Sequence, residues 1–311
     1  MKFLNNFKSI KGDASFRKFY RNKKNKSIII FSNKDKNQNL LIYDAVNKIL
    51  NKNKILAPKL ISQSYSNNFI EIQDLGKNTI YQLLHKKKIS KNLIFKKIIK
   101  ILNKIQSIKD KQIKNFKNKF YKIKKYNNET LYKEAKIFCD WYVPRKLSKK
   151  KCIKFNYQFK KEVKILLSKL NYKNDTFVHR DFHVSNLMYY ENKIGIIDTQ
   201  DALIGNKAYD LASLIDDVRF KTSNKFKENI YNYYLKTNKK VKHDKFKIDF
   251  EILSVLRNLK IIGIFVRLGE RDNKKRYLKL IPYAWKMIEY RVNKSKIFNN
   301  LTILLKKNSL R

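Results

Sequence analysis

The chain has 311 residues, with 73 Lys and Arg against 25 Asp and Glu, which gives a formal net charge of +48. Hydrophobic residues make up 43% and aromatic residues 13%, so the composition provides a core and excludes a disordered polycation or a basic tail. This length predicts either one large domain or two lobes around a cleft.

The positive charge consists mostly of Lys, since only 11 of the 73 basic residues are Arg. Lys, Asn, Ile, Phe and Tyr are abundant, whereas Gly and Pro number only 6 and 3. The abundant types share A/T-rich codons, so compositional drift that leaves Lys on solvated faces explains the charge, and a functional polyanion site is the alternative. Gly, Pro, Arg, Asp and His are disfavoured by such drift and are informative where they cluster.

Residues 1–75 predict a small lobe rich in β-strands. Short apolar runs with β-branched or aromatic residues alternate there with polar turns, and one stretch has the period of a helix. The predicted elements are a hairpin of 16–20 and 27–31 around a turn at 22–25, a helix over 40–50, and a strand over 69–72 that ends at Asp74-Leu75-Gly76.

Residues 76–311 predict a larger, mainly helical lobe with a small β insert. Beyond Gly76 the periodicity is helical, with Lys- and Asn-rich loops near 85–91 and 110–128. The remaining predicted elements are β runs at 177–178, 186–190 and 193–197 and helices at 208–219, 224–236, 249–268 and 276–291.

The chain carries no recognisable export or membrane signal. Its first eight residues lack the continuous apolar core of a signal peptide, and no stretch reaches the ~18 uncharged residues of a membrane span. We therefore expect a cytoplasmic protein. Cys139 and Cys152 have no CxxC spacing and no neighbouring His, which predicts reduced thiols.

The residue types that drift disfavours gather in one segment, which begins with His179-Arg180-Asp181 and continues to Asn186 and Asp198. The Asp in the loop supplies a carboxylate that can face a substrate hydroxyl. The Asn five positions later and the Asp that closes the next β-strand supply two oxygen ligands for a hard cation. Mg²⁺ prefers oxygen ligands and completes its octahedron with water and phosphate oxygens, so two protein ligands suffice.

The spacing HRDxxxxN followed by a strand-terminal Asp is that of the protein-kinase catalytic loop and metal-binding Asp. Asp198-Thr199-Gln200-Asp201 stands in place of a DFG, and no APE-type element follows, which excludes a conventional activation segment. The chain resembles the small-molecule branch of that fold, the aminoglycoside phosphotransferase superfamily, and within it the bacterial N-acetylmuramate/N-acetylglucosamine anomeric sugar kinases of cell-wall recycling. The stretches that carry the resemblance are 12–17 with Arg21, 71–76, 141–142, 179–188, 197–202, 209–217, 263–268, 271–272 and 276–278.

The resemblance implies an α+β, bilobal, protein-kinase-like fold that forms a single phosphotransferase domain. Its small antiparallel β-rich N-lobe, 1–75, is expected to bind the nucleotide. Its larger, mainly helical C-lobe, 76–311, is expected to carry the catalytic loop, the metal site and the substrate pocket. The implied cofactors are ATP and Mg²⁺.

The resemblance also implies roles for individual residues of the catalytic loop. Asp181 is expected to accept or orient the proton of the attacking hydroxyl, and its position matters more than its basicity because phosphoryl transfer is largely dissociative. Asn186 and Asp198 are expected to hold Mg²⁺. His183, two residues after Asp181, is expected to meet the substrate or the transferring phosphate.

Two further residues are expected to be structural anchors. His179 is expected to hydrogen-bond the backbone of the loop. Asp210 lies near the start of a predicted helix, where it either caps that helix or anchors the catalytic loop, and the resemblance favours the anchor.

For the nucleotide, the resemblance implies that the turn from Gly12 to Arg17 covers the phosphates. Gly12 allows close approach of the backbone, and Ser15 or Arg17 supplies hydrogen-bond donors. The hinge residues expected against adenine are Gln73, Asp74 and Leu75.

One expected part of a kinase site is missing from the sequence. A third-strand Lys normally pairs with the phosphates and with a helix Glu, but the run 28–31 has no Lys, and the helix 40–50 contains Asp44 and no Glu. Lys34 and Arg21 are the two candidates to replace that Lys, and the sequence does not choose between them.

The acceptor pocket is predicted from residues after the metal ligand and from the helical lobe. Gln200 and Asp201 are expected to hydrogen-bond sugar hydroxyls, with Glu134 and Trp141 as a polar and stacking wall. Trp141 has the alternative of a core aromatic. Two arginines four positions apart, Arg267 and Arg271, either meet an acidic group such as a lactyl carboxylate or pair with Glu270 or Asp272.

These features predict an ATP- and Mg²⁺-dependent kinase of a small hydroxylated molecule, with the anomeric hydroxyl of an N-acetylated amino sugar as the preferred acceptor. An aminoglycoside or other small substrate is the first alternative. A basic nucleic-acid-binding protein would need clustered charges with interleaved aromatics, which the sequence lacks, so we expect no nucleic-acid partner. A kinase-like binding module without activity is the third alternative, and the oligomeric state is not predicted.

Overall fold

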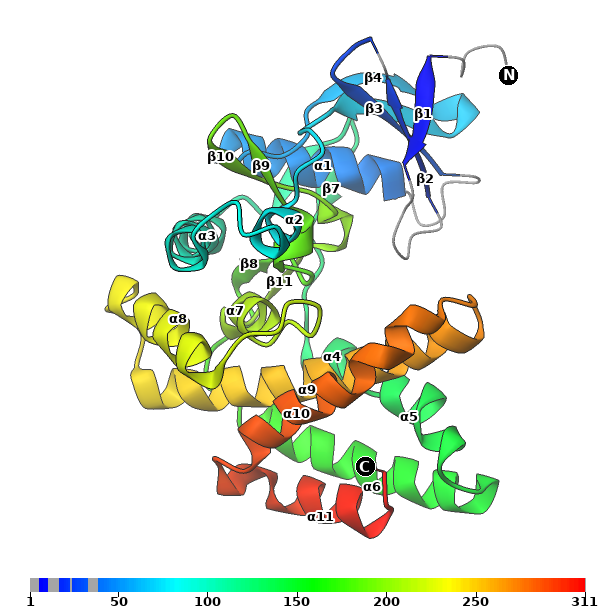
Figure 1. Cartoon of the computed structure of the whole chain (residues 1–311), viewed down its shortest axis with the longest axis vertical. Helices are drawn as coiled ribbons and strands as arrows, with labels where there is room; N and C mark the ends of the chain where they lie inside the picture. Colours follow the sequence, from blue (N-terminus) through cyan, green and yellow to red (C-terminus); the bar gives the residue numbers. More distant parts are fainter. Residues whose placement is uncertain (1–5, 11–16, 23, 33–38, 311) are drawn as a thin grey trace. The chain divides into compact units, whose positions relative to one another are not determined.

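The chain forms two compact units in the computed structural model (Figure 1). The structure describes residues 6–10, 17–22, 24–32 and 39–310. Unit 1 consists of Met1–Lys124 and Phe177–Ile204, and unit 2 consists of Lys125–Thr176 and Gly205–Arg311. The two units are defined by the contacts within each of them, and their boundaries differ from the predicted lobe boundary at residue 75. The division into lobes at that residue stays a prediction.

Unit 1 contains a five-stranded antiparallel sheet in the order β1-β2-β3-β5-β4. The predicted hairpin is confirmed, with Lys18 opposite Phe31 in register. The outer strands β1 and β4 were not predicted. The strands are β1 (Phe7–Ile10), β2 (Lys18–Asn22), β3 (Ser27–Phe31), β4 (Leu60–Ser64) and β5 (Phe69–Gln73).

The helix α1 (Asn39–Lys52) covers this sheet and confirms the predicted helix. Its apolar residues recur every three or four positions, so one face meets the strands. Leu40 and Tyr43 of the helix form a buried cluster with Ile30, Ile70 and Ile72 of the sheet. This packing fixes α1 against the strand β5, which leads into the predicted hinge.

The second stretch of unit 1 adds the β9–β10 hairpin (Figure 1), whose Ile196 N–H donates to the Leu56 carbonyl at 2.8 Å. Its turn residues Glu191 and Asn192 both have positive φ, 47° and 60°, as a tight two-residue hairpin turn requires. The register pairs Leu187 with Ile196. The other elements of unit 1 are α2 (Ile80–His85), α3 (Lys91–Gln106), β6 (Gln112–Lys114), β7 (Phe120–Lys122), β9 (Leu187–Tyr190) and β10 (Lys193–Ile196), with 3₁₀ turns η3 (Tyr65–Asn67), η5 (Val184–Asn186) and η6 (Thr199–Asp201). The strands β8 (Thr176–Val178) and β11 (Leu203–Gly205) lie mostly in unit 1, and their end residues Thr176 and Gly205 are assigned to unit 2.

Unit 2 is helical and is organised around one 28-residue helix, α9, which packs against α5, α7 and α10. Gly263 lies where α9 crosses α5, and a Cβ atom at this position would overlap the backbone of Ile137. Only Gly permits this approach. The elements of unit 2 are α4 (Asn128–Ala135), α5 (Ile137–Trp141), α6 (Lys149–Ser168), α7 (Ala208–Ile215), α8 (Asn224–Thr237), α9 (His243–Glu270), α10 (Ile281–Val292) and α11 (Asn299–Lys307), with 3₁₀ turns η4 (Val143–Arg145), η7 (Lys275–Leu280) and η8 (Lys296–Phe298).

The predicted elements correspond to the observed ones with shifted ends. The predicted helix 208–219 ends earlier, at Ile215, and the predicted helix 276–291 is a 3₁₀ turn followed by α10, whose first turn contains Pro282. A proline is tolerated in the first turn of a helix but not inside it, which explains the division. The predicted loop 110–128 contains the short β6–β7 hairpin.

A buried charge cluster ties four elements of unit 2 together at Asp216, directly after α7. Arg291 donates from Nε to Asp216 Oδ2 at 2.8 Å, and Ser254 Oγ donates to the same oxygen at 2.6 Å. Lys227 Nζ lies 3.3 Å from Asp216 Oδ1. Burial alone raises the pKa of Asp216, but the charges of Arg291 and Lys227 and the hydrogen bonds outweigh it and hold that pKa well below its usual range.

Among the described residues, no helix has both the length and the apolar character that crossing a membrane requires.

Candidate active site

The β9–β10 hairpin brings the two predicted metal ligands together. Leu187 pairs with Ile196, so the residues just outside this pair, Asn186 and Ile197, lie side by side. The Ile197 N–H donates to the Asn186 carbonyl at 3.1 Å. Asp198 follows Ile197, so the hairpin register places it one residue beyond the Asn186–Ile197 pair.

The loop that carries Asp181 is closed by hydrogen bonds to its own backbone. The carbonyl of Asp181 accepts from the His183 N–H and from Asn186 Nδ2, both at 3.0 Å. His179 is buried, and its Nε2 lies 3.0 Å from the carbonyl of Ile197. This last contact connects the start of the loop to the strand end before Asp198, and it supports the anchoring role proposed for His179.

Two residues of the site have left-handed backbone conformations that are uncommon outside glycine. Arg180 has φ 73° and Asp198 has φ 62°. Such conformations cost of order 1–2 kcal/mol and persist where the surroundings impose them. Arg180 Nη1 donates to the carbonyl of Asp201 at 3.1 Å, which connects the catalytic loop to the turn after Asp198.

Arg17 contacts the predicted metal ligand directly. Its side chain is buried, with Nη2 2.8 Å from Asp198 Oδ1 and Nη1 2.8 Å from Gln200 Oε1. It was predicted to donate to the nucleotide phosphates, and that role stays a prediction. The other residues predicted for the phosphate turn, Gly12 and Ser15, lie outside the described residues.

The structure also places the predicted sugar ligands Gln200 and Asp201. Gln200 is buried, and its Nε2 donates to Asp198 Oδ1 at 3.1 Å and to Asp201 Oδ2 at 2.7 Å. Asp201 keeps 54% of its side chain exposed. Gln200 therefore orders the carboxylates on both sides of it, and Asp201 remains accessible to a ligand. Their contacts with a sugar stay predictions.

The predicted hinge is tied to strand β2 by Arg21. Arg21 Nε lies 2.5 Å from Asp74 Oδ2, and its Nη2 donates to Asp74 Oδ1 at 3.0 Å and to the Gly76 carbonyl at 2.7 Å. Gly76 has φ 85°, which favours glycine in this turn. Arg21 therefore binds the hinge, and within the described part of the chain it forms no hydrogen bond or ion pair with the predicted metal ligands. Lys34, the other candidate to replace the missing Lys, lies outside the described residues.

The backbone of the hinge is partly used by the sheet. The N–H groups of Gln73 and Asp74 donate to the carbonyls of Lys59 and Lys26, at 2.8 and 2.9 Å. Leu75 is buried. An adenine contact from Gln73 or Asp74 would therefore use their carbonyl oxygens, and the contact of all three residues with the base stays a prediction.

Sequence analysis did not single out Asn47, which connects α1 to the site. Thr199 Oγ1 donates to Asn47 Oδ1 at 2.6 Å, and Asn47 Nδ2 donates to the Pro58 carbonyl at 2.9 Å. Both Asn47 and Thr199 are buried. The only signal in the sequence was a polar residue on the otherwise apolar face of a predicted helix.

The same region of α1 contains a buried hydroxyl close to the charges of the site. Burial raises the pKa of Tyr43 to about 12, an effect that the charge of Arg17 and a hydrogen bond with Asn47 partly oppose. Tyr43 is therefore neutral at physiological pH.

The remaining predicted site residues belong to unit 2. Glu134 is buried on α4, where its Oε2 accepts from Tyr126 Oη and from Lys260 Nζ, the latter at 2.8 Å. Trp141 is half-buried at the end of α5. Asp210 is buried in the first turn of α7, the position predicted for it. Their roles as substrate ligands and anchor stay predictions.

Arg267 lies in the last turn of α9 and Arg271 directly follows the helix. Arg271 pairs locally, with Nε 2.7 Å from Asp272 Oδ1. This is the ion-pair alternative that sequence analysis left open. Arg267 is half-buried, and burial lowers its pKa.

The donor set fits a Mg²⁺ ion. Asn186 provides an amide oxygen and Asp198 a carboxylate, and these hard oxygen ligands are brought together at one end of the hairpin. The Asp198 side chain is 39% exposed, so a hydrated cation can reach it. When bound, such an ion would neutralise charge on the phosphates of a nucleotide.

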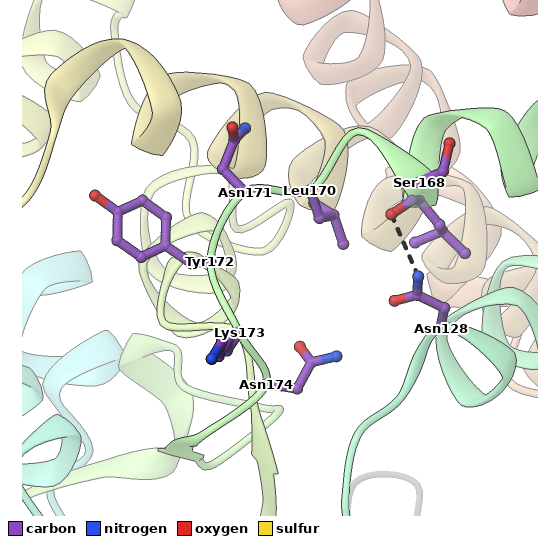
Figure 2. A pocket seen from close by; sticks show the side chains of 8 residues that line it. Asn128, Ser168, Leu170, Asn171, Tyr172, Lys173 and Asn174 are labelled. Carbon is purple, nitrogen blue, oxygen red and sulfur yellow. Dashed lines mark hydrogen bonds between the residues drawn. The ribbon is translucent and has the colours of Figure 1, made fainter.

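A separate surface pocket of ≈ 260 Å³ lies in unit 2. Figure 2 shows that Asn128 donates to the backbone at the end of α6, and the acceptor is the Leu167 carbonyl at 3.3 Å. None of the predicted site residues lines this pocket. Its lining residues are Asn128, Leu167, Ser168, Leu170, Asn171, Tyr172, Lys173 and Asn174.

Residues 6–244 match the model of the phosphotransferase enzyme family. The chain belongs to this family and is a small-molecule kinase, as the motif spacing predicted.

Relatives of known name are similar to this chain over most of its length. The chain is 27% identical over 280 residues to the N-acetylmuramate/N-acetylglucosamine kinase of Neisseria meningitidis serogroup B, a match that covers 87% of this chain and 80% of that protein. It is 26% identical over 284 residues to the kinase of the same name from Pseudomonas aeruginosa, with 89% and 81% covered.

Solved structures show the same fold. An ADP-bound aminoglycoside phosphotransferase APH(2'')-Ib matches with a TM-score of 0.59 at 14% identity, covering 92% of this chain and 94% of that one. A choline/ethanolamine kinase family protein from Mesorhizobium loti matches with a TM-score of 0.62 at 10% identity, covering 98% and 94%. At these identities the likeness concerns the fold alone, and it confirms the predicted protein-kinase-like α+β class.

Proposed function

We propose that this protein transfers the γ-phosphate of ATP to the anomeric hydroxyl of an N-acetylated amino sugar, N-acetylmuramate or N-acetylglucosamine. The main support for this acceptor is the similarity of more than four-fifths of the chain to relatives that share one name, N-acetylmuramate/N-acetylglucosamine kinase. The role in cell-wall recycling follows from the resemblance, and the cytoplasmic location follows from the lack of a recognisable export or membrane signal in the sequence; both stay predictions.

The proposed chemistry begins at Asp181. Its backbone is fixed by His183 and Asn186, so the carboxylate can orient the acceptor hydroxyl and take its proton as the bond to phosphorus forms. In a largely dissociative transition state the contribution of such a residue comes mainly from position. The closed loop supports that role because it restricts the conformations of Asp181.

Asn186 and Asp198 are proposed to hold Mg²⁺ against the phosphates of ATP. Their placement by one hairpin register supports this assignment, because a shift of the register would move the two residues apart. His183 and Asp201 are proposed to contact the acceptor, with Glu134 and Trp141 as further parts of its pocket.

Arg17 is proposed to take the place of the missing third-strand Lys. Strand β3 contains no basic residue, and Arg21 is engaged by Asp74. Arg17 is buried, and its guanidinium already lies on the carboxylate of Asp198. A guanidinium at this position can pair with phosphate oxygens once a cation occupies Asp198.

The proposal is tested with the purified chain, Mg²⁺-ATP and a panel of acceptors that includes both N-acetylated sugars, glucosamine, choline and kanamycin, with ADP release as the measurement. We expect turnover with the N-acetylated sugars and its loss in Asp181→Asn, which should still bind ATP. Turnover restricted to kanamycin or choline would reject the acceptor, and undiminished turnover in Asp181→Asn would reject the role of that residue.

A further inference from the structure

The helix α6 of unit 2 leaves large apolar side chains on its solvent side. Ile153 is 71% exposed, Tyr157 is 76% exposed and Ile165 is 37% exposed. Among the residues that the structure describes, no other helix exposes more than one large apolar side chain. Single exposed apolar residues are common on protein surfaces, whereas several that share one surface indicate a site of interaction.

The core of unit 2 does not use these side chains, because α6 packs through its opposite face. Phe155 and Phe159 are buried on that face and stack with ring centroids 5.8 Å apart, and Phe155 also meets Phe138 of α5. With 3.6 residues per turn, Ile153 and Tyr157 are neighbours on the side that points away from these rings. The apolar residues on the solvent side are therefore additional to those that the fold requires.

The solvent side of α6 is also strongly basic. The helix contains seven Lys and one Glu, and all seven lysines are exposed. Lys154 and Lys161 lie three positions before and four positions after Tyr157, so they flank its ring on the same face. Within the described part of the chain, no lysine of α6 forms an ion pair. We call this surface the α6 outer face, and its residues are Lys150, Ile153, Lys154, Tyr157, Lys161 and Lys164.

The mixture of cations and apolar side chains discriminates between possible partners. The phosphates of a nucleic acid would satisfy the lysines but would give Ile153 no apolar environment. A protein partner normally buries a contiguous apolar core, whereas lysines surround the apolar side chains here. An anionic lipid surface meets both requirements, because its phosphates attract the lysines and the acyl chains beneath them receive Ile153 and Tyr157.

We propose that the α6 outer face binds the surface of an anionic lipid membrane. Tyr157 and Ile153 enter the boundary between headgroups and acyl chains, and the phenol of Tyr157 suits this boundary because it joins an apolar ring to a polar hydroxyl. The long lysine side chains around them extend to the lipid phosphates. The inference concerns unit 2 alone and does not depend on the acceptor of the kinase reaction.

The test measures sedimentation of the full chain with vesicles of equal parts phosphatidylglycerol and phosphatidylcholine, and with vesicles of phosphatidylcholine alone. We expect binding to the first and none to the second. Each lysine near an anionic surface contributes a factor of about five to the partition coefficient, so Lys154→Gln with Lys161→Gln should lower it by about 25-fold. Ile153→Ser with Tyr157→Ser keeps the charge and should lower it by at least about fivefold.

Matched controls are available on α3 in unit 1, whose solvent side also carries lysines but only one exposed large apolar residue, Leu93. Leu93→Ser, and Lys97→Gln with Lys100→Gln, should leave the partition coefficient within about twofold of the wild type, because charges away from the contact are screened by salt. Equal losses in the α3 and α6 variants would overturn the inference, since they would show attraction by the overall charge alone. Full binding by Ile153→Ser with Tyr157→Ser, or no binding by the wild type, would also overturn it.

A second measurement reports entry into the bilayer. Tyr157→Trp places a fluorophore on the α6 outer face, keeps an aromatic side chain, and tests the face independently of any loss of stability in the Ser variants. Against the background of Trp141 and Trp285 in the wild type, we expect its emission to shift to the blue on the anionic vesicles and to be quenched by brominated acyl chains. Bound vesicles that leave the emission unchanged would overturn the inference. So would a DNA duplex whose affinity falls in Ile153→Ser with Tyr157→Ser as far as that for vesicles, which would assign the face to nucleic acid.

Discussion

At Asp198, a single carboxylate oxygen accepts from both Arg17 and Gln200, at 2.8 and 3.1 Å. This oxygen belongs to the residue that we propose as a ligand of Mg²⁺. In the absence of a cation, the guanidinium of Arg17 supplies the positive charge that the carboxylate needs. Under the proposed function, Arg17 has two successive partners, first Asp198 and then the phosphates of the nucleotide.

Replacing Arg17 by Ala should therefore weaken the use of ATP. Hydrogen bonds to charged groups contribute about 1.5–3 kcal/mol, so we expect kcat/KM for ATP to fall by roughly 10- to 100-fold. Arg17→Lys should lose less than Arg17→Ala because it retains the charge. Steady-state kinetics at saturating sugar measures the effect.

The matched control is Lys18→Ala, which removes an exposed cation from the adjacent position. Its kcat/KM should stay within about twofold of the wild type, because exposed charges interact weakly with their surroundings. Equal losses in both variants would mean that Arg17 acts only through the general positive charge of the protein.

The candidate site could be predicted in part, because the chemistry expected of its residues fixes their spacing. The sequence places Asp181, Asn186 and Asp198 in a loop and at the two ends of a predicted hairpin. The register of that hairpin brings Asn186 and Asp198 close in the chain fold. Asn47 could not be predicted, since a buried polar residue on a helix shows its partner only after folding. The contacts of Gln200 were missed for the same reason.

At the scale of elements, the helix α1 contacts the turn after Asp198 without an ion pair between a strand Lys and a helix Glu. Asn47 accepts from Thr199, and Thr199 directly follows Asp198 in its left-handed conformation. The hydrogen bond therefore helps to hold the proposed metal ligand in a backbone conformation that it would not adopt alone.

Thr199→Val removes the donor to Asn47 while keeping the shape of the side chain. We expect it to raise the Mg²⁺ concentration needed for half-maximal activity by about 2- to 13-fold, since a typical hydrogen bond contributes about 0.5–1.5 kcal/mol. Thr199→Ser keeps the hydroxyl and should behave like the wild type. The binding of Mn²⁺ to the ATP complex, followed by electron paramagnetic resonance, gives a second readout.

If Thr199→Val and Thr199→Ser raise the Mg²⁺ concentration needed for half-maximal activity equally, the hydroxyl of Thr199 does not affect the metal site. The proposed connection through Asn47 would then be wrong.

The crossing of α5 and α9 depends on Gly263. A Cβ atom at this position would overlap the backbone of Ile137, which cannot move without displacing α5. We expect Gly263→Ala to lower the free energy of unfolding by about 1–3 kcal/mol, the usual range for overpacking, as measured by urea denaturation.

Gly269→Ala is the control for the same helix. Its Cβ would meet the end of the Leu278 side chain, which can change rotamer. The loss of stability should be smaller than for Gly263→Ala, and a larger loss would contradict the reason given for the glycine at 263.

The order of elements could be predicted better than their ends. Periodic apolar runs identified α1, α8, α9 and the β9–β10 hairpin. The strands β1 and β4 were missed because they lie at the two edges of the sheet and contain several polar residues, so little apolar periodicity marks them. The 3₁₀ turn before α10 depends on local geometry that periodicity does not report.

At the scale of the whole molecule, the net charge of +48 coexists with a buried network of ion pairs. In unit 2, Asp216 is completely buried and is surrounded by Arg291, Lys227 and Ser254. Two buried cations depend on this carboxylate. Removing one partner of a buried charge network is strongly destabilising because it leaves the other charges uncompensated.

The stability of the protein should therefore fall with acid through Asp216. Its pKa in the folded chain lies well below that of an unfolded Asp, about 3.9. Its contribution to stability is present above the unfolded pKa and is lost as the pH falls from about 5 toward the folded pKa. Thermal unfolding between pH 7 and pH 3 measures this loss.

Asp216→Asn should reduce the stability at pH 7 by about 3–5 kcal/mol and should flatten the fall of Tm below pH 5. A variant whose Tm depends on pH as steeply as that of the wild type would assign the acid sensitivity to other carboxylates. Glu129→Gln is the control, since Glu129 forms only an exposed pair with Lys133 and should change little.

The sequence also led to the correct family because its composition is so biased. Against a background of Lys and Asn, the clustered His, Asp and Gly residues stood out, and the family match over residues 6–244 confirms that they mark a phosphotransferase. That the charge itself reflects compositional drift stays a prediction, under which it adds only a long-range attraction for anions such as ATP.

The reaction at the anomeric hydroxyl is tested most directly by comparing N-acetylglucosamine with its methyl glycoside, in which a methyl group blocks that hydroxyl. With Mg²⁺-ATP, we predict ADP release and a sugar phosphate, seen by ³¹P NMR, for the free sugar and neither for the glycoside. Equal phosphorylation of both compounds would show that another hydroxyl reacts and would contradict the proposed function.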